Sequence, residues 1–290
     1  MAEHDEIFSI AAEPEHWKLV SSTLPIEDNP VLDAGYARWR ERGNTHSHSF
    51  RELLFCFSGE TFEHFAGRDY RCRPGSVFLF DAREAHASGY PKEGGSFVHL
   101  WIVGLGGTAV ANFYCQREGK PEEQRMMPMV LADAECRLLN RSWSGDETPM
   151  PWMTPAFRRT SLTSAIFAVI LRAIEHWHAP PPADAAPLRC QEIVAAVKRH
   201  IEGHLADAET LDVLAHLSGY SKFHFSRMFK GCSGQTVHNF VDSCRMKKAR
   251  ELIQGGVPRK EIAGTLGFSC PAAFSNWLRK NRVQLSADSR

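Results

Sequence analysis

Two histidines, His46 and His48, are separated by one residue in a region whose short apolar and aromatic runs favour β structure. Alternate side chains of an extended strand point to the same face, so both imidazoles can reach one ion inside a barrel. Imidazole nitrogen is a common ligand of divalent transition metals. The pair is therefore a candidate metal-binding element.

A second set of side chains has the chemistry to contact nucleic acid. Phe223, Ser226, Arg227 and Lys230 recur at i, i+3, i+4 and i+7, which places them on one face of a helix. Arg227 can donate two parallel hydrogen bonds to guanine O6 and N7, Phe223 can lie against a thymine methyl group, and Ser226 can bond several bases. Lys222 and Lys230 are placed to contact phosphates, which fix register without reading sequence. An ion pair within the domain is the alternative for Arg227.

The stretch LDVLAHLSGYSKFHFSRMFK, which begins at Leu211, contains the elements that would position this face. Its first part has apolar residues at i, i+3 and i+4, typical of a short amphipathic helix. Gly219 permits a sharp turn, and Ser221 would cap a second helix. Phe225 and Phe229 are four residues apart on that helix and would face a core. The pattern predicts a helix-turn-helix.

The same pattern returns further along the chain. Four positions of the first pattern correspond to positions 48 or 49 residues later: Ala215 to Ala263, Gly219 to Gly267, Phe225 to Phe274 and Phe229 to Leu278. Between them, one long helix is predicted to run from Val237 through Leu252 and to close at Gly255 and Gly256. Such a repeat predicts two DNA-reading modules in one domain.

The run from about Leu188 to Arg290 resembles the DNA-binding domain of the AraC/XylS family of bacterial transcription regulators. The matching segments are LAHLSGYS, SRMFK, Gly234, RMKKARELI from Arg245 and EIAGTLGF from Glu261. The resemblance implies an all-α double helix-turn-helix that inserts one helix of each module into successive major grooves. By the same resemblance, the base-contacting positions are Phe223, Ser226 and Arg227.

The second module departs from the family pattern. Its outward face has Ala272, Ser275 and Asn276, with Asn276 where the family usually has arginine. Asn276 could still bond adenine N6 and N7. Arg259 replaces an apolar residue and Val283 replaces a glycine. Positive charge for the DNA backbone is offered by Arg279, Lys280 and Arg282. We therefore expect the first module to discriminate bases and the second mainly to anchor.

Around the histidine pair, the sequence resembles the cupin motifs. His-x-His followed by Glu52 resembles the first motif, and residues 75–86 resemble the second, although Asp81 and Arg83 replace its usual proline and glycine. In metal-binding cupins the corresponding ligands would be His46, His48, Glu52 and His86. Regulators with this fold often keep the pattern as pocket residues without a metal. The resemblance thus implies an effector pocket, with a divalent metal as an alternative occupant.

Charge divides the chain into two halves. The 290 residues are 43% hydrophobic and 23% charged, with net charge +0. Residues 188–290 contain 16 Lys+Arg and 9 Asp+Glu, a balance of +7 that leaves −7 for residues 1–187. A basic half beside an acidic half indicates a polyanionic partner for one part only. The cysteines form no CxxC pair, and no apolar run approaches the roughly 20 residues that cross a bilayer. We therefore expect a cytoplasmic, nucleoid-associated protein without a membrane partner.

The remaining patterns predict the domain organisation. Short aromatic and β-branched runs at 34–42, 51–57, 61–66, 76–80 and 96–103, separated by turn signals, favour a barrel or sandwich. A helix is predicted near 132–143, and a long amphipathic helix follows residue 155. Its apolar stripe could pack on its own barrel or on a second subunit; the family resemblance favours a homodimer. The predicted divisions are a cupin-like effector-binding domain (1–107), a helical connecting or dimerisation segment (108–178), a Pro-rich linker (179–187) and the DNA-binding domain (188–290).

The predicted fold class is thus α+β multidomain, with a cupin-like β-barrel and an all-α double helix-turn-helix. The predicted function is sequence-specific transcription regulation, not catalysis. The expected partners are double-stranded DNA, a small-molecule effector and a second copy of the chain, with RNA polymerase as a further candidate. The alternative is a metal-dependent cupin enzyme, a dioxygenase or isomerase, with an accessory helical domain. A non-specific architectural DNA protein is disfavoured, because backbone charge alone would not require a sensor-sized N-terminal half.

Overall fold

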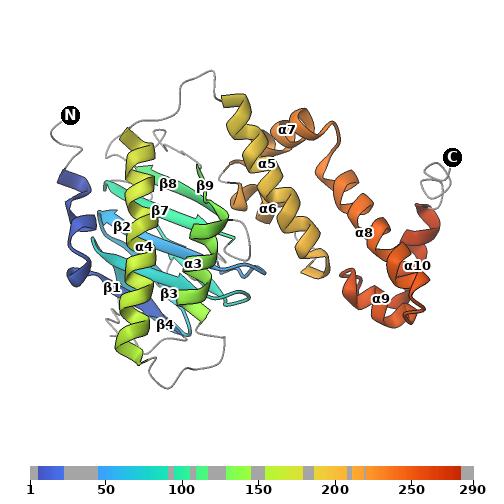
Figure 1. Cartoon of the computed structure of the whole chain (residues 1–290), viewed down its shortest axis with the longest axis horizontal. Helices are drawn as coiled ribbons and strands as arrows, with labels where there is room; N and C mark the ends of the chain where they lie inside the picture. Colours follow the sequence, from blue (N-terminus) through green and yellow to red (C-terminus); the bar gives the residue numbers. More distant parts are fainter. Residues whose placement is uncertain are drawn as a thin grey trace.

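The computed structural model (Figure 1) describes residues 6–22, 45–90, 95–104, 109–116, 129–144, 154–178, 186–207, 211–218 and 220–281. The strands are β1 (Lys18–Ser21), β2 (Glu52–Ser58), β3 (Thr61–Phe65), β4 (Arg68–Cys72), β5 (Ser76–Phe80), β6 (His86–Gly89), β7 (Phe97–Val103), β8 (Val110–Gln116) and β9 (Met129–Val130). The α-helices are α3 (Asp133–Ser144), α4 (Pro155–His178), α5 (Ala186–Gly203), α6 (Leu211–Leu217), α7 (Lys222–Ser233), α8 (Val237–Gln254), α9 (Arg259–Thr265) and α10 (Pro271–Lys280). Short 3₁₀ helices are η1 (Ser9–Ala12), η2 (Pro14–His16) and η4 (Leu205–Asp207). The predicted run 34–42 lies outside the described residues.

The strands form two sheets that face each other. One has six strands in the order β1-β5-β2-β7-β8-β9, and the other has three in the order β4-β3-β6. Phe65 and Tyr70 of the smaller sheet each lie 6.1 Å, ring to ring, from Phe78 of the larger sheet. The described strands therefore confirm a sheet-rich, cupin-like domain, but as two facing sheets and not as one continuous closed barrel.

Alternation along the central strand β2 sends its side chains to two different cores. Leu53, Phe55 and Phe57 belong to an outer core that also contains residues of α3 and α4. Leu54 and Cys56 belong to the inner core between the sheets. This follows from the period of two in a strand. Glu52 has the same parity as Leu54, so its carboxylate lies on the inner face.

Helices α3 and α4 cover the outer face of the larger sheet, as Figure 1 shows. The predicted apolar stripe of α4 is buried in this contact. Its buried members are Leu162, Ala165, Ile166, Val169, Ile170, Ala173 and Trp177. The Trp177 ring lies 4.9 Å from the Phe113 ring of β8. Of the two alternatives for this stripe, the structure therefore shows packing on the chain's own sheet.

The predicted boundary at residue 107 is wrong, because the sheet continues beyond it. β8 pairs antiparallel with β7 from Phe97↔Gln116 to Val103↔Val110, and β9 pairs with β8. The segment 108–178 is therefore not wholly helical. The signal was weak because polar residues interrupt the apolar pattern of β8, whose sequence is VANFYCQ.

The helical half contains both predicted helix-turn-helix modules. Ser221 caps α7 by accepting a hydrogen bond from the His224 backbone nitrogen, as predicted. Gly255 caps the long helix α8. In the second module Gly267 has φ +74, and a Cβ there would lie 2.5 Å from the Ala206 carbonyl oxygen. Only glycine fits this turn, since both the backbone angle and the close contact exclude a side chain. The corresponding Gly219 lies outside the described residues.

The two halves share a hydrophobic core. Phe50, Val103 and Val110 of the sheet domain belong to the same cluster of buried side chains as Ile193 and Val197 of α5. The chain between them, residues 179–185, lies outside the described part. Helix α5 begins at Ala186, so the last two residues of the predicted linker, 186 and 187, are helical. The helical half therefore packs directly on the sheet domain through its first helix.

Two further observations concern the whole described chain. Within these residues, no helix is both long and apolar enough to cross a membrane. All eight cysteines are free thiols.

The orientation of α7 gives a first prediction. Phe225 is 0% exposed and Phe223 is 82% exposed on the same helix. Phe225→Ala should lower the free energy of unfolding by about 3–5 kcal/mol, because it leaves a cavity in the core. Phe223→Ala should change it by less than about 0.5 kcal/mol. Denaturant unfolding of the full chain, followed by circular dichroism, measures both. Equal losses would contradict this orientation.

Candidate nucleic-acid interface and candidate ligand site

The exposed side of α7 has the aromatic and basic groups that the sequence predicts. We call Phe223, Ser226, Arg227 and Lys230 the recognition face. Phe223, Arg227 and Lys230 are exposed and Ser226 is half-buried. Phe225 and Phe229 on the opposite side are both 0% exposed and lie 5.7 Å apart, ring to ring. The core therefore fixes which side of α7 is offered to a partner.

Contacts within the domain already hold two of the residues predicted to contact DNA. Lys222 Nζ lies 2.9 Å from Asp212 Oδ2 on α6. The Ser226 hydroxyl donates to the Lys222 carbonyl oxygen at 2.8 Å. Within the described residues, no ion pair is found for Arg227 or Lys230. The alternative of an intradomain ion pair for Arg227 therefore gains no support, and Lys222 is less available to a phosphate than Lys230.

The second module presents a different face. Ala272 and Asn276 are exposed on α10 and Ser275 is half-buried. Arg279 Nη2 donates to Asn276 Oδ1 at 2.9 Å, so the amide oxygen is engaged by a neighbour on its own helix. Arg279 and Lys280 are exposed, while Arg282 and Val283 lie outside the described residues. That this module anchors more than it reads bases stays a prediction.

In the sheet domain, the four predicted ligands come together although His86 is far from the others in sequence. We call His46, His48, Glu52 and His86 the His/Glu cluster. Their ligand atoms all lie within 4.8 Å of one another. Glu52 and His86 are 0% exposed and His48 is 7% exposed, whereas His46 is exposed. Backbone hydrogen bonds between His46 and His86, 3.0 Å in both directions, join the two motifs.

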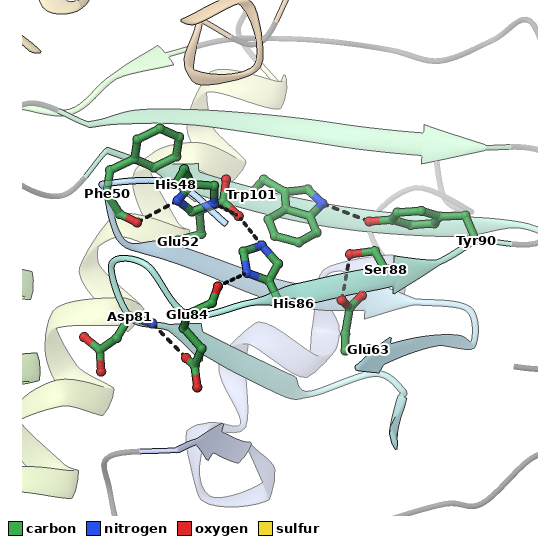
Figure 2. Close-up of polar contacts among 10 residues, drawn as sticks. All are labelled: His48, Phe50, Glu52, Glu63, Asp81, Glu84, His86, Ser88, Tyr90 and Trp101. Carbon is green, nitrogen blue, oxygen red and sulfur yellow. Dashed lines mark hydrogen bonds and ion pairs between the residues drawn. The ribbon is translucent and has the colours of Figure 1, made fainter. Parts of the chain in front are cut away.

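The hydrogen bonds of the two buried histidines fix which nitrogen faces the cluster (Figure 2). His48 Nδ1 lies 2.8 Å from the Phe50 carbonyl oxygen, and His86 Nδ1 lies 3.0 Å from that of Glu84. A carbonyl oxygen can only accept, so both Nδ1 atoms carry hydrogen. In a neutral imidazole, Nε2 then presents a lone pair.

Both Nε2 atoms point toward the same carboxylate oxygen. They lie 3.0 Å (His48) and 3.1 Å (His86) from Glu52 Oε2. His48 Nε2 makes no hydrogen bond despite this distance. His86 Nε2 donates a hydrogen bond to this oxygen when it carries a proton. Without a proton or a metal ion among them, three electron-pair donors this close repel one another. Two ligands held at about 2.1 Å from one ion at a right angle are about 3 Å apart, so these residues fit a divalent transition metal.

A contact that the sequence did not indicate extends from this cluster. The Phe50 ring stacks on His48 with centroids 3.9 Å apart and planes 5° apart. Phe50 also meets the His200 ring of α5 edge to face at 5.6 Å. Phe50 belongs to neither predicted motif, and only the packing of α5 shows that it connects the two halves.

The fold and the exposed face of α7 define a protein with a helix-turn-helix half and a separate sheet-rich half. Comparison with known families gives an AraC-like ligand binding domain at residues 29–125 and a helix-turn-helix domain at residues 214–282. The regulatory protein SoxS of Salmonella typhimurium is 31% identical over 101 residues, which are 34% of this chain and 94% of SoxS. The HTH-type regulator YfiF of Bacillus subtilis is 26% identical over 231 residues, 77% of this chain and 71% of YfiF. YbfI of the same organism is 31% identical over 90 residues, 31% of this chain and 30% of YbfI.

The chain belongs to the AraC/XylS family. It is a transcription regulator with a helix-turn-helix DNA-binding domain and a ligand-binding domain, as the sequence resemblance predicts. Which side chains contact DNA or the ligand remains a prediction.

The recognition face gives a prediction about base reading. Arg227→Ala should weaken binding to the cognate site by about 1–3 kcal/mol and relax the preference at one base position. The reason is the loss of two hydrogen bonds to a guanine edge. Fluorescence anisotropy with the cognate duplex and with single-base variants measures the change.

Lys230 gives the matched prediction for phosphate contact. Lys230→Ala should weaken binding to cognate and random duplexes alike and reduce the salt slope by about one unit. Titrations at several salt concentrations measure this slope. If Arg227→Ala and Lys230→Ala lowered cognate and random binding identically, the assignment of separate roles would be wrong.

Proposed function

We propose that this regulator senses a divalent metal ion through the His/Glu cluster and controls a promoter that it binds through α7 and α10. The observation that carries the proposal is the approach of two Nε2 atoms, of His48 and His86, to Glu52 Oε2 at 3.0 and 3.1 Å. Both histidines are oriented by a backbone carbonyl on the far side of the ring, as metal-bound histidines usually are. His46, His48, Glu52 and His86 would hold the ion.

The choice of ion follows from the ligand types. Three imidazoles and one carboxylate, with neighbouring ligand atoms about 3 Å apart, favour Mn²⁺, Fe²⁺ or Ni²⁺ over a tetrahedral zinc site. When bound, the metal would supply positive charge that neutralises Glu52. The exposed His46 leaves the site accessible from solvent on one side. A small-molecule effector could therefore reach the metal there.

Communication with the DNA-binding half would run through Phe50. Its ring lies between His48 and His200, and it shares a core with Ile193 and Ile201 of α5. Coordination of an ion by His48 would shift its imidazole ring and so change the packing of Phe50. This change would favour one position of α5 relative to the sheet domain over another. This is the physical link that coupling between two sites requires.

The proposal includes a homodimer built on α3 and α4, acting at bacterial DNA in the cytoplasm. The apolar stripe of α4 packs on the chain's own sheet, so the dimer interface must be formed by another surface of these helices. Three of the five exposed large hydrophobic side chains in the described residues lie on these helices: Leu138, Phe157 and Leu171. Leu171→Glu should shift the sedimentation coefficient of the full chain from dimer to monomer.

Metal removal tests the sensor. The chelator-treated full chain should take up one Mn²⁺, Fe²⁺ or Ni²⁺ per chain at the His/Glu cluster, measured by calorimetry and elemental analysis. Glu52→Ala and His86→Ala should abolish this binding, because each removes a buried ligand. His238→Ala, an exposed histidine of α8, is the control and should bind normally. Uptake that survives both ligand substitutions would place the metal elsewhere.

The role of Phe50 is tested by a substitution that keeps apolar volume. The metal should change operator affinity by about fivefold or more in the original protein. The Phe50→Leu variant should still bind metal and DNA. The metal should change its operator affinity much less, because leucine cannot stack on the His48 ring. Phe62→Leu, the same substitution at a half-buried aromatic of β3, should keep the metal response. A full metal response in Phe50→Leu would exclude this route.

A metal-dependent enzyme, a dioxygenase or isomerase, is the second candidate, because the same ligands with one side open also suit catalysis. The two candidates give opposite results. A regulator changes its DNA affinity on metal binding, whereas an enzyme turns over a small substrate while its DNA affinity stays constant.

A further inference from the structure

A second group of metal-ligating side chains lies in the interior between the two sheets. We call Cys56, Cys72 and His99 the Cys/His cluster. Cys56 and His99 are directly opposite in the β2–β7 pairing, so they share the inner face of the larger sheet. Cys72 comes from β4 of the smaller sheet. All three residues are 0% exposed. The cluster therefore bridges the two sheets.

The spacing of the three groups suits one ion. Their ligand atoms all lie within 4.8 Å of one another. Cys72 Sγ is 3.9 Å from His99 Nε2. A sulfur at about 2.3 Å and a nitrogen at about 2.0–2.1 Å from the same tetrahedral Zn²⁺ are about 3.5–3.6 Å apart. An ion needs only a small adjustment of the side chains.

His99 also has the outer contact typical of a metal ligand. Its Nδ1 lies 3.2 Å from the Tyr90 hydroxyl, which accepts a hydrogen bond from Trp101 Nε1 at 2.9 Å. Figure 2 shows the Tyr90–Trp101 contact. The Tyr90 oxygen can accept from both neighbours, and this leaves the lone pair of His99 Nε2 directed at the thiols.

Two buried polar atoms beside the cluster have no partner. Thr61 is paired with Cys72 in the β3–β4 register, and its hydroxyl oxygen makes no hydrogen bond. Glu63 accepts from the Ser88 hydroxyl at 2.7 Å through Oε2, but its Oε1 makes none. Burial raises the pKa of the Glu63 carboxyl well above its usual value. Unpaired oxygens in a dry interior are costly, so a further partner is expected here.

We propose that Cys56, Cys72 and His99 form an interior site for a thiophilic divalent ion, Zn²⁺, distinct from the His/Glu cluster. Binding replaces the two thiol protons, so Zn²⁺ enters and two H⁺ leave. The two thiolates then balance the two positive charges of the ion within the buried site. Glu63 Oε1 or a water molecule would complete the coordination. The ion would tie the smaller sheet to the larger one.

Cobalt is the test probe because only thiolate ligands give a sulfur-to-metal charge-transfer band in the near ultraviolet. The reduced, chelator-treated full chain should show this band with Co²⁺, and Zn²⁺ should abolish it. Cys56→Ser and Cys72→Ser should each lose it. Cys115→Ser, a buried thiol of β8 in the outer core, should keep it. His86→Ala should also keep it, and this separates failure of this site from failure of the His/Glu cluster.

A variant that keeps both thiols is the control for loss of folding. Tyr90→Phe should retain the band but weaken Co²⁺ binding by about 10- to 100-fold, because it removes the outer contact of His99. Each variant is checked by circular dichroism. A folded original chain without the band, a band that survives in both cysteine variants, or a Cys56–Cys72 disulfide that excludes metal would overturn the proposal.

Discussion

The alternation of side chains along β2 is the constraint on which the sheet domain depends. Every second residue, Leu53, Phe55 and Phe57, packs in the outer core beneath α3 and α4. The alternate residues, Glu52, Leu54 and Cys56, face the smaller sheet. One strand thus supplies a member of each ligand cluster. A shift of one residue in the pairing of β2 would turn Glu52 and Cys56 toward the helices. It would turn Phe55 and Phe57 toward the smaller sheet.

The same strand arrangement explains how a binding event could reach DNA. The His/Glu cluster lies at the end of the interior that is nearest α5, because Phe50, two residues before Glu52, already belongs to the shared core. Helix α5 in turn packs on α7, so within the described residues one hydrophobic core connects the sheet domain to α7. The contact is made of packed rings and aliphatic side chains, which have few alternative arrangements at native density. Such a contact can transmit a choice between discrete states.

The two helix-turn-helix modules have similar cores but different outward faces. Phe225 in the first and Phe274 in the second are both 0% exposed, so both helices are held in the same way. Their outward faces differ: the first exposes Phe223 and Arg227, whereas Asn276 in the second is engaged by Arg279. The buried phenylalanine is thus repeated in both modules, whereas the exposed residues differ. This is expected because packing of the helix and contact with a partner depend on different side chains.

The sequence alone determined the features that depend on local periodicity. The positions of Phe225 and Phe229 on a period of 3.6 defined the buried side of α7 and hence its recognition face. The Ser221 cap, the glycine after α8 and the apolar stripe of α4 were readable for the same reason. The four residues of the His/Glu cluster were found through motifs, although no local rule shows that His86 meets Glu52.

Tertiary structure decided everything that depends on long-range pairing. It decided that the stripe of α4 packs on its own sheet and that β8 and β9 extend that sheet beyond residue 107. It alone brought Cys72 to His99 across the interior, and Phe50 to His200 between the halves. These partners are separated by tens to more than a hundred residues and follow no motif. Sequence periodicity states which side of an element is apolar, but which other element covers that side depends on how the whole chain packs.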